Sequence, residues 1–113
     1  MEAVLVVDDQ PDVLSMATEM FRTLGLEVLA ASSGKHALEI LRRRPDVSLL
    51  FTDVVMPEMT GVELAKAAKK ELPELKVILS SGFSAPAGDL EDFAYLPKPY
   101  RLGDLVRKLR VLG

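Results

Sequence analysis

The chain of 113 residues contains no cysteine. It therefore cannot form a disulfide framework, a thiolate metal site or a cysteine nucleophile. It also lacks an apolar run near the ~20 residues that a membrane-spanning helix needs. The first residues, MEAVLVVDDQPD, have no basic segment, and their apolar run breaks at Asp8, so they do not form a signal peptide. We therefore expect a cytoplasmic protein that does not insert into membranes.

Neither sign of charge dominates the sequence. It has 14 Lys and Arg against 17 Asp and Glu, a net charge of −3, which argues against a direct nucleic-acid partner. The basic residues form two groups that are typical of solvated helix faces. They are Arg42, Arg43 and Arg44, and Arg101, Arg107, Lys108 and Arg110. With 49% hydrophobic residues the chain can bury a core, and its length fits one domain over residues 1–113.

Short apolar runs alternate with segments of helical periodicity along the chain. The apolar runs predict strands over residues 3–7, 27–31, 47–51, 76–79 and 93–96. Helical spacing and capping residues predict helices that begin near Pro11, near Ser32 or Ser33, at Thr60 and at Leu102. Strands that alternate with helices indicate a parallel sheet with right-handed crossovers and helices on both faces.

The connection between the fourth and fifth predicted strands is short. Ten residues, 83–92, lie between Gly82 and Phe93, and they include Pro86 and Gly88. A parallel crossover with its helix takes at least ~10–12 residues, and three turns of helix need ~11. We therefore expect the fourth helix to be shortened or missing.

Polar side chains stand where the predicted strands end. They are, in chain order, Asp8, Asp9, Asp53, Ser80, Ser81 and Lys98. In a doubly wound sheet, sites form beyond the carboxyl ends of the strands, at the point where strand order reverses. With strand order 2-1-3-4-5, three carboxylates, a hydroxyl and an ammonium would meet at one edge of the sheet.

Such a cluster of carboxylates is suited to bind a divalent cation and to receive a phosphoryl group. Neighbouring carboxylates repel, and a divalent cation relieves the repulsion. Oxygen-only ligands favour Mg²⁺ or Mn²⁺ over zinc or copper. A metal and Lys98 would neutralise charge on a transferring phosphoryl group, and one carboxylate would be the nucleophile. A simpler role as a helix N-cap remains an alternative for Asp9.

Four motifs in order carry a resemblance to a known family. They are VVDD at 6–9, TDVVMPEMTG at 52–61, SSG at 80–82 and LPKP at 96–99. On these motifs the chain resembles a response regulator receiver domain of two-component signalling, with a similarity to the receivers of hybrid histidine kinases. The resemblance covers nearly the whole chain. It implies an α/β fold of the flavodoxin-like (βα)5 type, a doubly wound parallel sheet with strand order 2-1-3-4-5.

The resemblance also implies a phosphoacceptor and a metal site. Asp53 would accept the phosphoryl group. Asp9 would be a direct Mg²⁺ ligand, Asp8 would act mainly through a coordinated water, and the backbone carbonyl of Val55 would complete the protein's share of the metal shell.

The remaining implied roles concern switching. Lys98 would pair with the phosphoryl group, and its bond to Pro99 would be cis. Ser81, rather than Ser80, matches the switch hydroxyl. Tyr95 matches the aromatic position that changes rotamer on activation, although a tyrosine in a last strand can also serve packing alone.

The function implied by the resemblance is that of a phosphorelay switch. Asp53 would accept a phosphoryl group from a phosphohistidine of a histidine kinase or a histidine phosphotransfer protein. The change in conformation would control an effector domain or output protein. We expect only self-catalysed phosphotransfer and dephosphorylation, so the chain would not be an enzyme in the ordinary sense. It would be a stand-alone receiver or part of a larger protein.

Other functions fit the sequence less well. A pseudo-receiver that acts only as an interaction module would not need the complete acid set. A phosphohydrolase like the haloacid dehalogenases needs a second acid two residues after its nucleophile, where this chain has Val55. No glycine-rich phosphate loop follows the first strand, which disfavours nucleotide binding. His36, the only histidine, is predicted to be a surface residue and not a phosphodonor.

Overall fold

Five parallel strands form one sheet in the order β2-β1-β3-β4-β5 in a computed structural model that describes residues 3–83 and 93–112. The strands are β1 (Ala3–Val7), β2 (Glu27–Ala31), β3 (Leu49–Asp53), β4 (Lys76–Ser81) and β5 (Ala94–Pro97). The described residues hold four helices, α1 (Pro11–Thr23), α2 (Gly34–Arg43), α3 (Gly61–Glu71) and α4 (Leu102–Leu112). The predicted doubly wound, flavodoxin-like α/β fold is thus confirmed.

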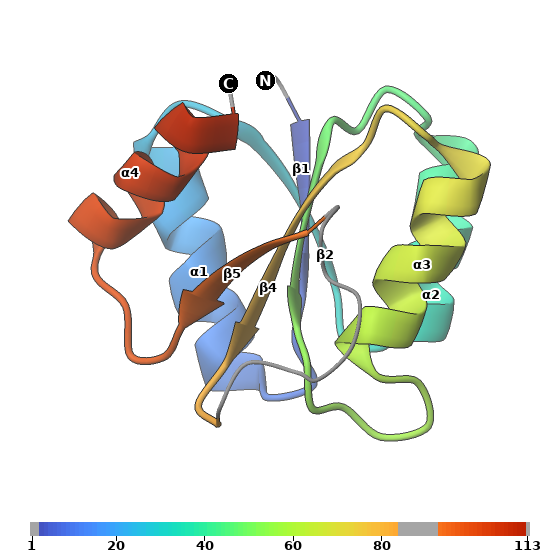
Figure 1. Cartoon of the computed structure of the whole chain (residues 1–113), viewed down its shortest axis with the longest axis horizontal. Helices are drawn as coiled ribbons and strands as arrows, with labels where there is room; N and C mark the ends of the chain where they lie inside the picture. The colour runs from blue at the N-terminus through green and yellow to red at the C-terminus, as the bar shows by residue number, and fades with distance from the viewer. Residues whose placement is uncertain (1–2, 84–92, 113) are drawn as a thin grey trace.

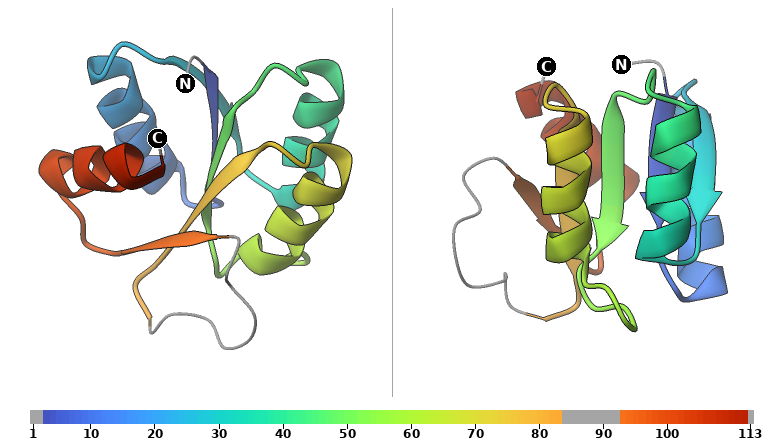
Figure 2. Two further views of the ribbon diagram at one scale, coloured as in Figure 1. Left: turned by 45° about the horizontal axis from the view of Figure 1, so that its top comes forward. Right: turned by 90° about the vertical axis from the view of Figure 1, so that its right-hand side faces the viewer.

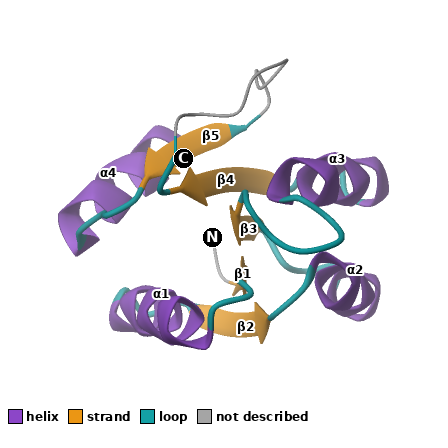
Figure 3. Cartoon of the chain, turned by 90° about the horizontal axis from the view of Figure 1, so that it is seen from below, coloured by secondary structure: helices purple, strands orange, loops and turns teal. Residues whose placement is uncertain are grey.

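The helices form two layers around the sheet. Helices α1 and α4 cover one face, and α2 and α3 cover the other (Figures 1 and 3). When α2 and α3 are turned toward the viewer, the strands run behind them and α1 and α4 lie beyond the sheet (Figure 2). Within residues 3–83 and 93–112, every helix is too short or too polar to cross a bilayer.

The alternation of side chains along each strand divides the core into two apolar clusters. The cluster under α2 and α3 includes Leu5, Leu50, Val77, Leu79, Leu41 and Leu64. The cluster under α1 and α4 includes Val4, Val6, Phe51, Ile78, Phe21 and Leu105. Because the central strands are buried on both faces, their sequences read as continuous apolar runs rather than alternating ones.

The third strand differs from its predicted bounds. The sequence predicts residues 47–51, whereas β3 is Leu49–Asp53. Pairing with β1 begins with Val4 opposite Leu49, after Ser48 has donated a backbone hydrogen bond of 3.0 Å to the carbonyl of Ala3. Consequently Asp53 is the last residue of the strand and is buried, whereas the predicted strand ends two residues before it.

Most of the helix starts follow the sequence signals. Ser33 caps α2, and its hydroxyl accepts from the backbone N–H of His36. Thr60 and Glu63 form the predicted capping box at the start of α3. The expected absence of a regular helix between β4 and β5 concerns residues 84–92, which lie outside the described residues.

The turn from β3 into α3 folds back tightly on the strand. The N–H of Gly61 donates to the carbonyl of Val54 at 2.9 Å. A Cβ atom at Gly61 would lie 2.1 Å from the backbone oxygen of Asp53. Glycine is therefore required here by the close approach of two backbone segments, and this approach fixes the end of β3.

We expect Gly61→Ala to lower the free energy of unfolding by about 1–3 kcal/mol, because the strand end or the helix start must shift. Urea denaturation followed by circular dichroism measures the change. Gly103→Ala in α4 is the matched control, because its Cβ would make only an ordinary contact of 3.7 Å with Arg107. The control is expected to be neutral or stabilising by up to ~1 kcal/mol. Equal effects of the two substitutions would contradict the steric account.

Candidate functional site

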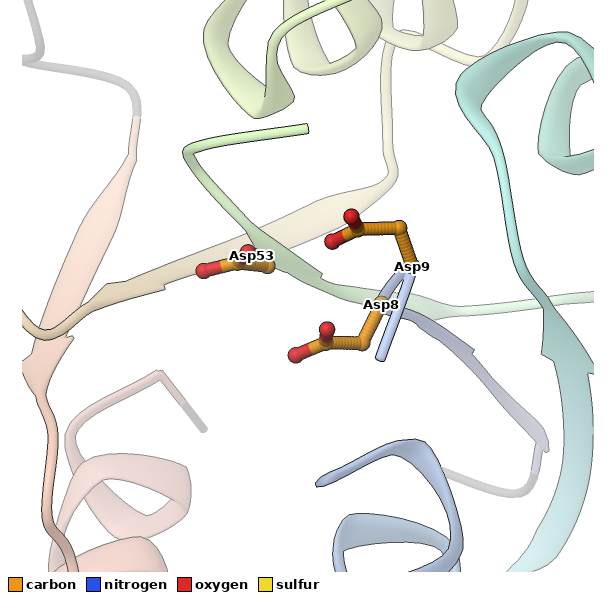
Figure 4. A group of neighbouring side chains, drawn as sticks. All are labelled: Asp8, Asp9 and Asp53. Carbon is orange, nitrogen blue, oxygen red and sulfur yellow. The ribbon is translucent and has the colours of Figure 1, made fainter. Parts of the chain in front are cut away.

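Three carboxylates meet at the carboxyl end of the sheet. Asp8 and Asp9 directly follow β1, and Asp53 ends the neighbouring strand β3. One oxygen from each carboxylate lies within 4.8 Å of the other two. Figure 4 shows the three side chains side by side where β1 and β3 end. The strand order thus brings together the acids that the sequence predicts to be neighbours.

The ammonium of Lys98 joins two of these carboxylates. Its Nζ atom donates to Oδ2 of Asp8 and to Oδ1 of Asp53, each at 3.1 Å. The side chains of Asp8 and Asp53 are only 6% and 10% exposed. A buried carboxylate is costly unless a charge or hydrogen bonds compensate it. Lys98 supplies that compensation from the segment after β5.

Asp8 and Asp9 are held differently. The second oxygen of Asp8, Oδ1, accepts from the backbone N–H of Gln10 at 3.0 Å, so both of its oxygens are engaged. The Asp9 side chain is partly exposed, and it accepts no hydrogen bond from residues 3–83 or 93–112. Of the two acids after β1, Asp9 is the one whose oxygens remain available to a ligand.

The pKa values of the site reflect competition between burial and charge. Burial raises the pKa of the Asp53 carboxyl, and Asp8 and Asp9 raise it further, while Lys98 opposes the shift only in part. Burial works to lower the pKa of the Lys98 ammonium, but its hydrogen bonds to Asp53 and Asp8 outweigh this, and the pKa lies above its ordinary value. The site therefore favours the charged form of Lys98 and disfavours the ionised form of Asp53.

Asp53 and Lys98 line a cavity of about 560 Å³. Its other lining residues are Asp9, Gln10, Val55, Met56, Pro57, Ser81, Gly82 and Phe83. Val55 is 55% exposed at this cavity. Ser80, by contrast, is fully buried, does not line the cavity, and has no hydrogen-bond partner for its hydroxyl among the described residues. Although Ser80 is the β4 residue paired with Asp53, Ser81 is the serine that lines the cavity together with Asp53 and Lys98.

Ser81 and Tyr95 are connected through one turn. The Ser81 Oγ atom accepts from the backbone N–H of Phe83 at 3.0 Å. The Tyr95 hydroxyl donates to the carbonyl of Phe83 at 2.8 Å and lies 3.3 Å from that of Ser81. Tyr95 also packs against the apolar cluster under α2 and α3. Tyr95 thus has both a packing role and a polar contact to the turn that follows β4.

Two residues at the site were missed by the sequence reasoning. Tyr100 packs edge-on against Phe51, with ring centroids 5.6 Å apart, and burial together with the charges of Asp8 and Asp53 raises its pKa to about 12. Its place just after the LPKP motif was the available signal. Gln10 contributes only its backbone N–H, which any residue except proline would offer, so its identity gave no signal.

The Lys98–Pro99 bond is cis, as predicted.

The donor set fits a hard divalent cation. The clustered ligands are carboxylate oxygens, and within the described part of the chain Asp9 accepts no hydrogen bond that a metal would have to displace. His36 lies exposed near the start of α2 and is not part of the cluster. An acidic cluster, an ammonium and a hydroxyl around one buried carboxylate can together receive and neutralise a phosphoryl group.

Known proteins are similar to this chain in sequence and fold. A family model described as "Response regulator receiver domain" matches residues 4–110. The "Response regulator receiver protein CpdR" of Brucella abortus (strain 2308) is 37% identical over 114 residues, which cover 96% of this chain and 94% of that protein.

Solved structures agree with the family match. Chemotaxis protein CheY4 of Vibrio cholerae superimposes with a TM-score of 0.90 at 26% identity, over 100% of this chain and 99% of that one. A chain from the crystal structure of histidine kinase ThkA in complex with response regulator protein TrrA gives a TM-score of 0.85 at 28% identity, over 99% and 98% of the two chains.

We expect Asp53→Asn to raise the free energy of unfolding at pH 7 in the absence of divalent cations. The pKa of Asp53 is higher in the folded chain than in the unfolded one, because the folded state disfavours the ionised carboxylate. At pH values above both pKa values, ionised Asp53 therefore lowers the free energy of unfolding. The gain should shrink as the pH falls and disappear below about 3.9, the pKa of an unfolded Asp, where the carboxyl is protonated in both states.

Asp46→Asn is the control, because pairing with Arg44 lowers the pKa of that carboxyl and its removal should bring no such gain. Urea midpoints at pH 7 and pH 4 measure both effects. If the parent chain has a higher free energy of unfolding than Asp53→Asn at pH 7, the conclusion that ionised Asp53 destabilises the folded state is wrong.

Proposed function

Because this chain belongs to the response regulator receiver domain family, we propose that it is a phosphoacceptor of two-component signalling. Asp53 receives the phosphoryl group from a phosphohistidine of a histidine kinase or phosphotransfer protein. The observation that carries the proposal is the position of the Asp53 carboxylate, which lies beside the Asp8 and Asp9 carboxylates and accepts from the Lys98 ammonium. The similarity to a chain from a complex with a histidine kinase supports this class of partner.

The cluster is suited to Mg²⁺ or Mn²⁺. Asp9 and Asp53 would hold the ion directly, and the backbone carbonyl of Val55 would add a third ligand. Asp8 would act through water, because its two oxygens already accept from Lys98 and Gln10. When bound, the ion supplies positive charge that offsets the charge on the phosphoryl oxygens.

The chain's own residues account for the rest of the transfer. An oxygen of Asp53 attacks phosphorus, and the P–N bond to the donor's imidazole breaks with its electron pair kept on nitrogen. Lys98 keeps its contact with Asp8 and turns its other contact from Asp53 to a phosphoryl oxygen. The Ser81 hydroxyl, whose oxygen already accepts from the backbone N–H of Phe83, donates a hydrogen bond to a second phosphoryl oxygen.

Switching follows from the movement of Ser81. Its reorientation toward the phosphoryl group would disturb the turn through Phe83, which accepts from the Tyr95 hydroxyl. Tyr95 lies on β5, so a change at the phosphorylated carboxylate reaches the edge of the sheet. An effector domain or output protein that contacts this edge would read the change.

Incubation with acetyl phosphate and Mg²⁺ is expected to add the mass of one phosphoryl group to the parent chain. Asp53→Ala should show no gain, because the nucleophile is removed, whereas Asp46→Ala, an exposed acid outside the site, should react like the parent. Intact-mass spectrometry at matched times makes the comparison. The same mass gain in Asp53→Ala would refute the assignment.

Mg²⁺ binding is expected to depend on Asp9. Asp9→Asn removes the most accessible carboxylate of the cluster, so the affinity should fall by about tenfold or more, as for other changes at a metal shell. Calorimetric titration without phosphate measures it. Asp12→Asn is the control, because this exposed acid of α1 lies three positions from Asp9 but is not in the cluster. Unchanged affinity in Asp9→Asn would place the metal elsewhere.

A further inference from the structure

The loop over residues 54–60 joins β3 to α3 and forms one wall of the cavity that contains Asp53. We call this cavity the acidic cavity. Three residues of the loop line it, namely Val55, Met56 and Pro57. The conformation of the loop therefore determines where the Val55 carbonyl, which we propose as a Mg²⁺ ligand, lies relative to the carboxylates.

The loop contains a strained turn centred on Glu58. The backbone N–H of Met59 donates to the carbonyl of Pro57 at 2.7 Å, which closes a turn of three residues, and the φ angle of Glu58 is +67°. Three-residue turns with a positive φ at their centre are rare and strained, and a residue with a Cβ atom rarely adopts such a φ. Strain of this kind persists only where the surrounding structure fixes it. The contacts of the residues next to Glu58 must therefore hold the turn.

Met59 makes the contact that can hold this turn. Its side chain packs on the apolar cluster under α2 and α3 and lies against Gly34, the buried first residue of α2. A Cβ atom at Gly34 would lie 2.6 Å from Sδ of Met59 and 3.1 Å from its Cβ. A new rotamer of Met59 would move Sδ but not Cβ, so a larger residue at position 34 has to displace the backbone of the loop. The φ angle of Gly34 is not in the left-handed region, so this contact, rather than the backbone conformation, calls for a glycine.

We propose that Met59 is a positioning residue for the acidic cavity. Its packing on Gly34 holds the strained turn at Glu58, and the turn holds the Val55 carbonyl beside the carboxylates that bind the divalent cation. The inference rests on the proposed function, and it adds to the site a residue that touches neither the ion nor the phosphoryl group. Because neither Met59 nor Gly34 lines the cavity, their effect passes through the backbone of the loop.

The first test is the affinity of the chain for Mg²⁺, measured by calorimetric titration without phosphate. Loss of a group that orients a metal ligand costs about 10–100-fold in affinity. We therefore expect Met59→Ala, which removes the anchor, and Gly34→Ala, which displaces it, each to lower the affinity by about tenfold. Met59→Leu keeps an apolar side chain of similar volume, so its affinity should stay within about threefold of the parent value.

Ile40→Ala is the control for a general loss of packing. Ile40 packs on the same apolar cluster but lies near the other end of α2 from Gly34. This substitution should lower the free energy of unfolding and leave the Mg²⁺ affinity unchanged. Far-ultraviolet circular dichroism checks that every variant is folded under the conditions of the titration.

The second test removes the strain instead of the anchor. Glycine adopts a positive φ without steric cost, so the loop of Glu58→Gly keeps its conformation without help from Met59. Adding Glu58→Gly to Met59→Ala should therefore bring the Mg²⁺ affinity back to within about threefold of the parent value. Glu58→Ala removes the same carboxylate but retains a Cβ atom, so adding it to Met59→Ala should restore nothing. Rates of phosphorylation by acetyl phosphate, followed by intact mass, should rank the variants in the same order.

Three results would overturn the inference and leave the proposed function intact. They are a parent-like affinity in Met59→Ala, an equal loss of affinity in Ile40→Ala, and a recovery that is absent with Glu58→Gly or equally large with Glu58→Ala. A parent chain that neither binds Mg²⁺ nor gains a phosphoryl group would instead show that the proposed function is wrong, and the inference would fail with it.

Discussion

The mutual repulsion of three carboxylates, which the Lys98 ammonium opposes, is the constraint on which the rest of the site depends. Sheet order brings the acids together, because β1 and β3 are neighbours. Lys98 reaches them from the segment after β5, although it is 90 positions from Asp8 in the sequence. The ion pairs therefore tie the last strand to the first, and removing the lysine would leave Asp8 and Asp53 buried without a counter-charge. A raised pKa at Asp53 is the sign that compensation is incomplete. An additional positive charge near Asp53 would therefore stabilise its ionised form.

The same constraint explains how the site can influence distant parts of the chain. The ends of β4 and β5 are tied at several points close to Asp53. The backbone N–H of Lys98 donates to the carbonyl of Ser81 at 2.8 Å, and the Tyr95 hydroxyl donates to Phe83. A group that draws Lys98 and Ser81 toward Asp53 therefore acts on both strands at once. The apolar core beneath is closely packed and transmits such shifts instead of absorbing them.

Sequence reasoning succeeded where the physical signal is local or carried by a motif. Continuous apolar runs predicted a sheet buried on both faces, and its order then placed the acids and the lysine together. It failed at the start of β3, where a residue is buried but not paired in the sheet. Val47 is buried like a strand residue, yet its backbone N–H donates to the carbonyl of Arg44. The pairing of β3 with β1 begins only at Leu49. The contact from the backbone N–H of Gln10 to Asp8 and the place of Tyr100 beside the site were also missed. These features depend on contacts between segments far apart in the sequence, which periodicity and composition do not encode.

The central claim is that Asp53, among several neighbouring acids, is the residue that accepts the phosphoryl group. The most direct test is to phosphorylate the parent chain with phosphoimidazole and Mg²⁺, reduce the acyl phosphate with borohydride, and locate the reduced residue by peptide mass spectrometry. Reduction converts an aspartyl phosphate to homoserine, so the modified position is read without any substitution. The account predicts modification at Asp53 and at neither Asp8 nor Asp9. Reduction at Asp8 or Asp9, or at an acid outside the cluster, would contradict it.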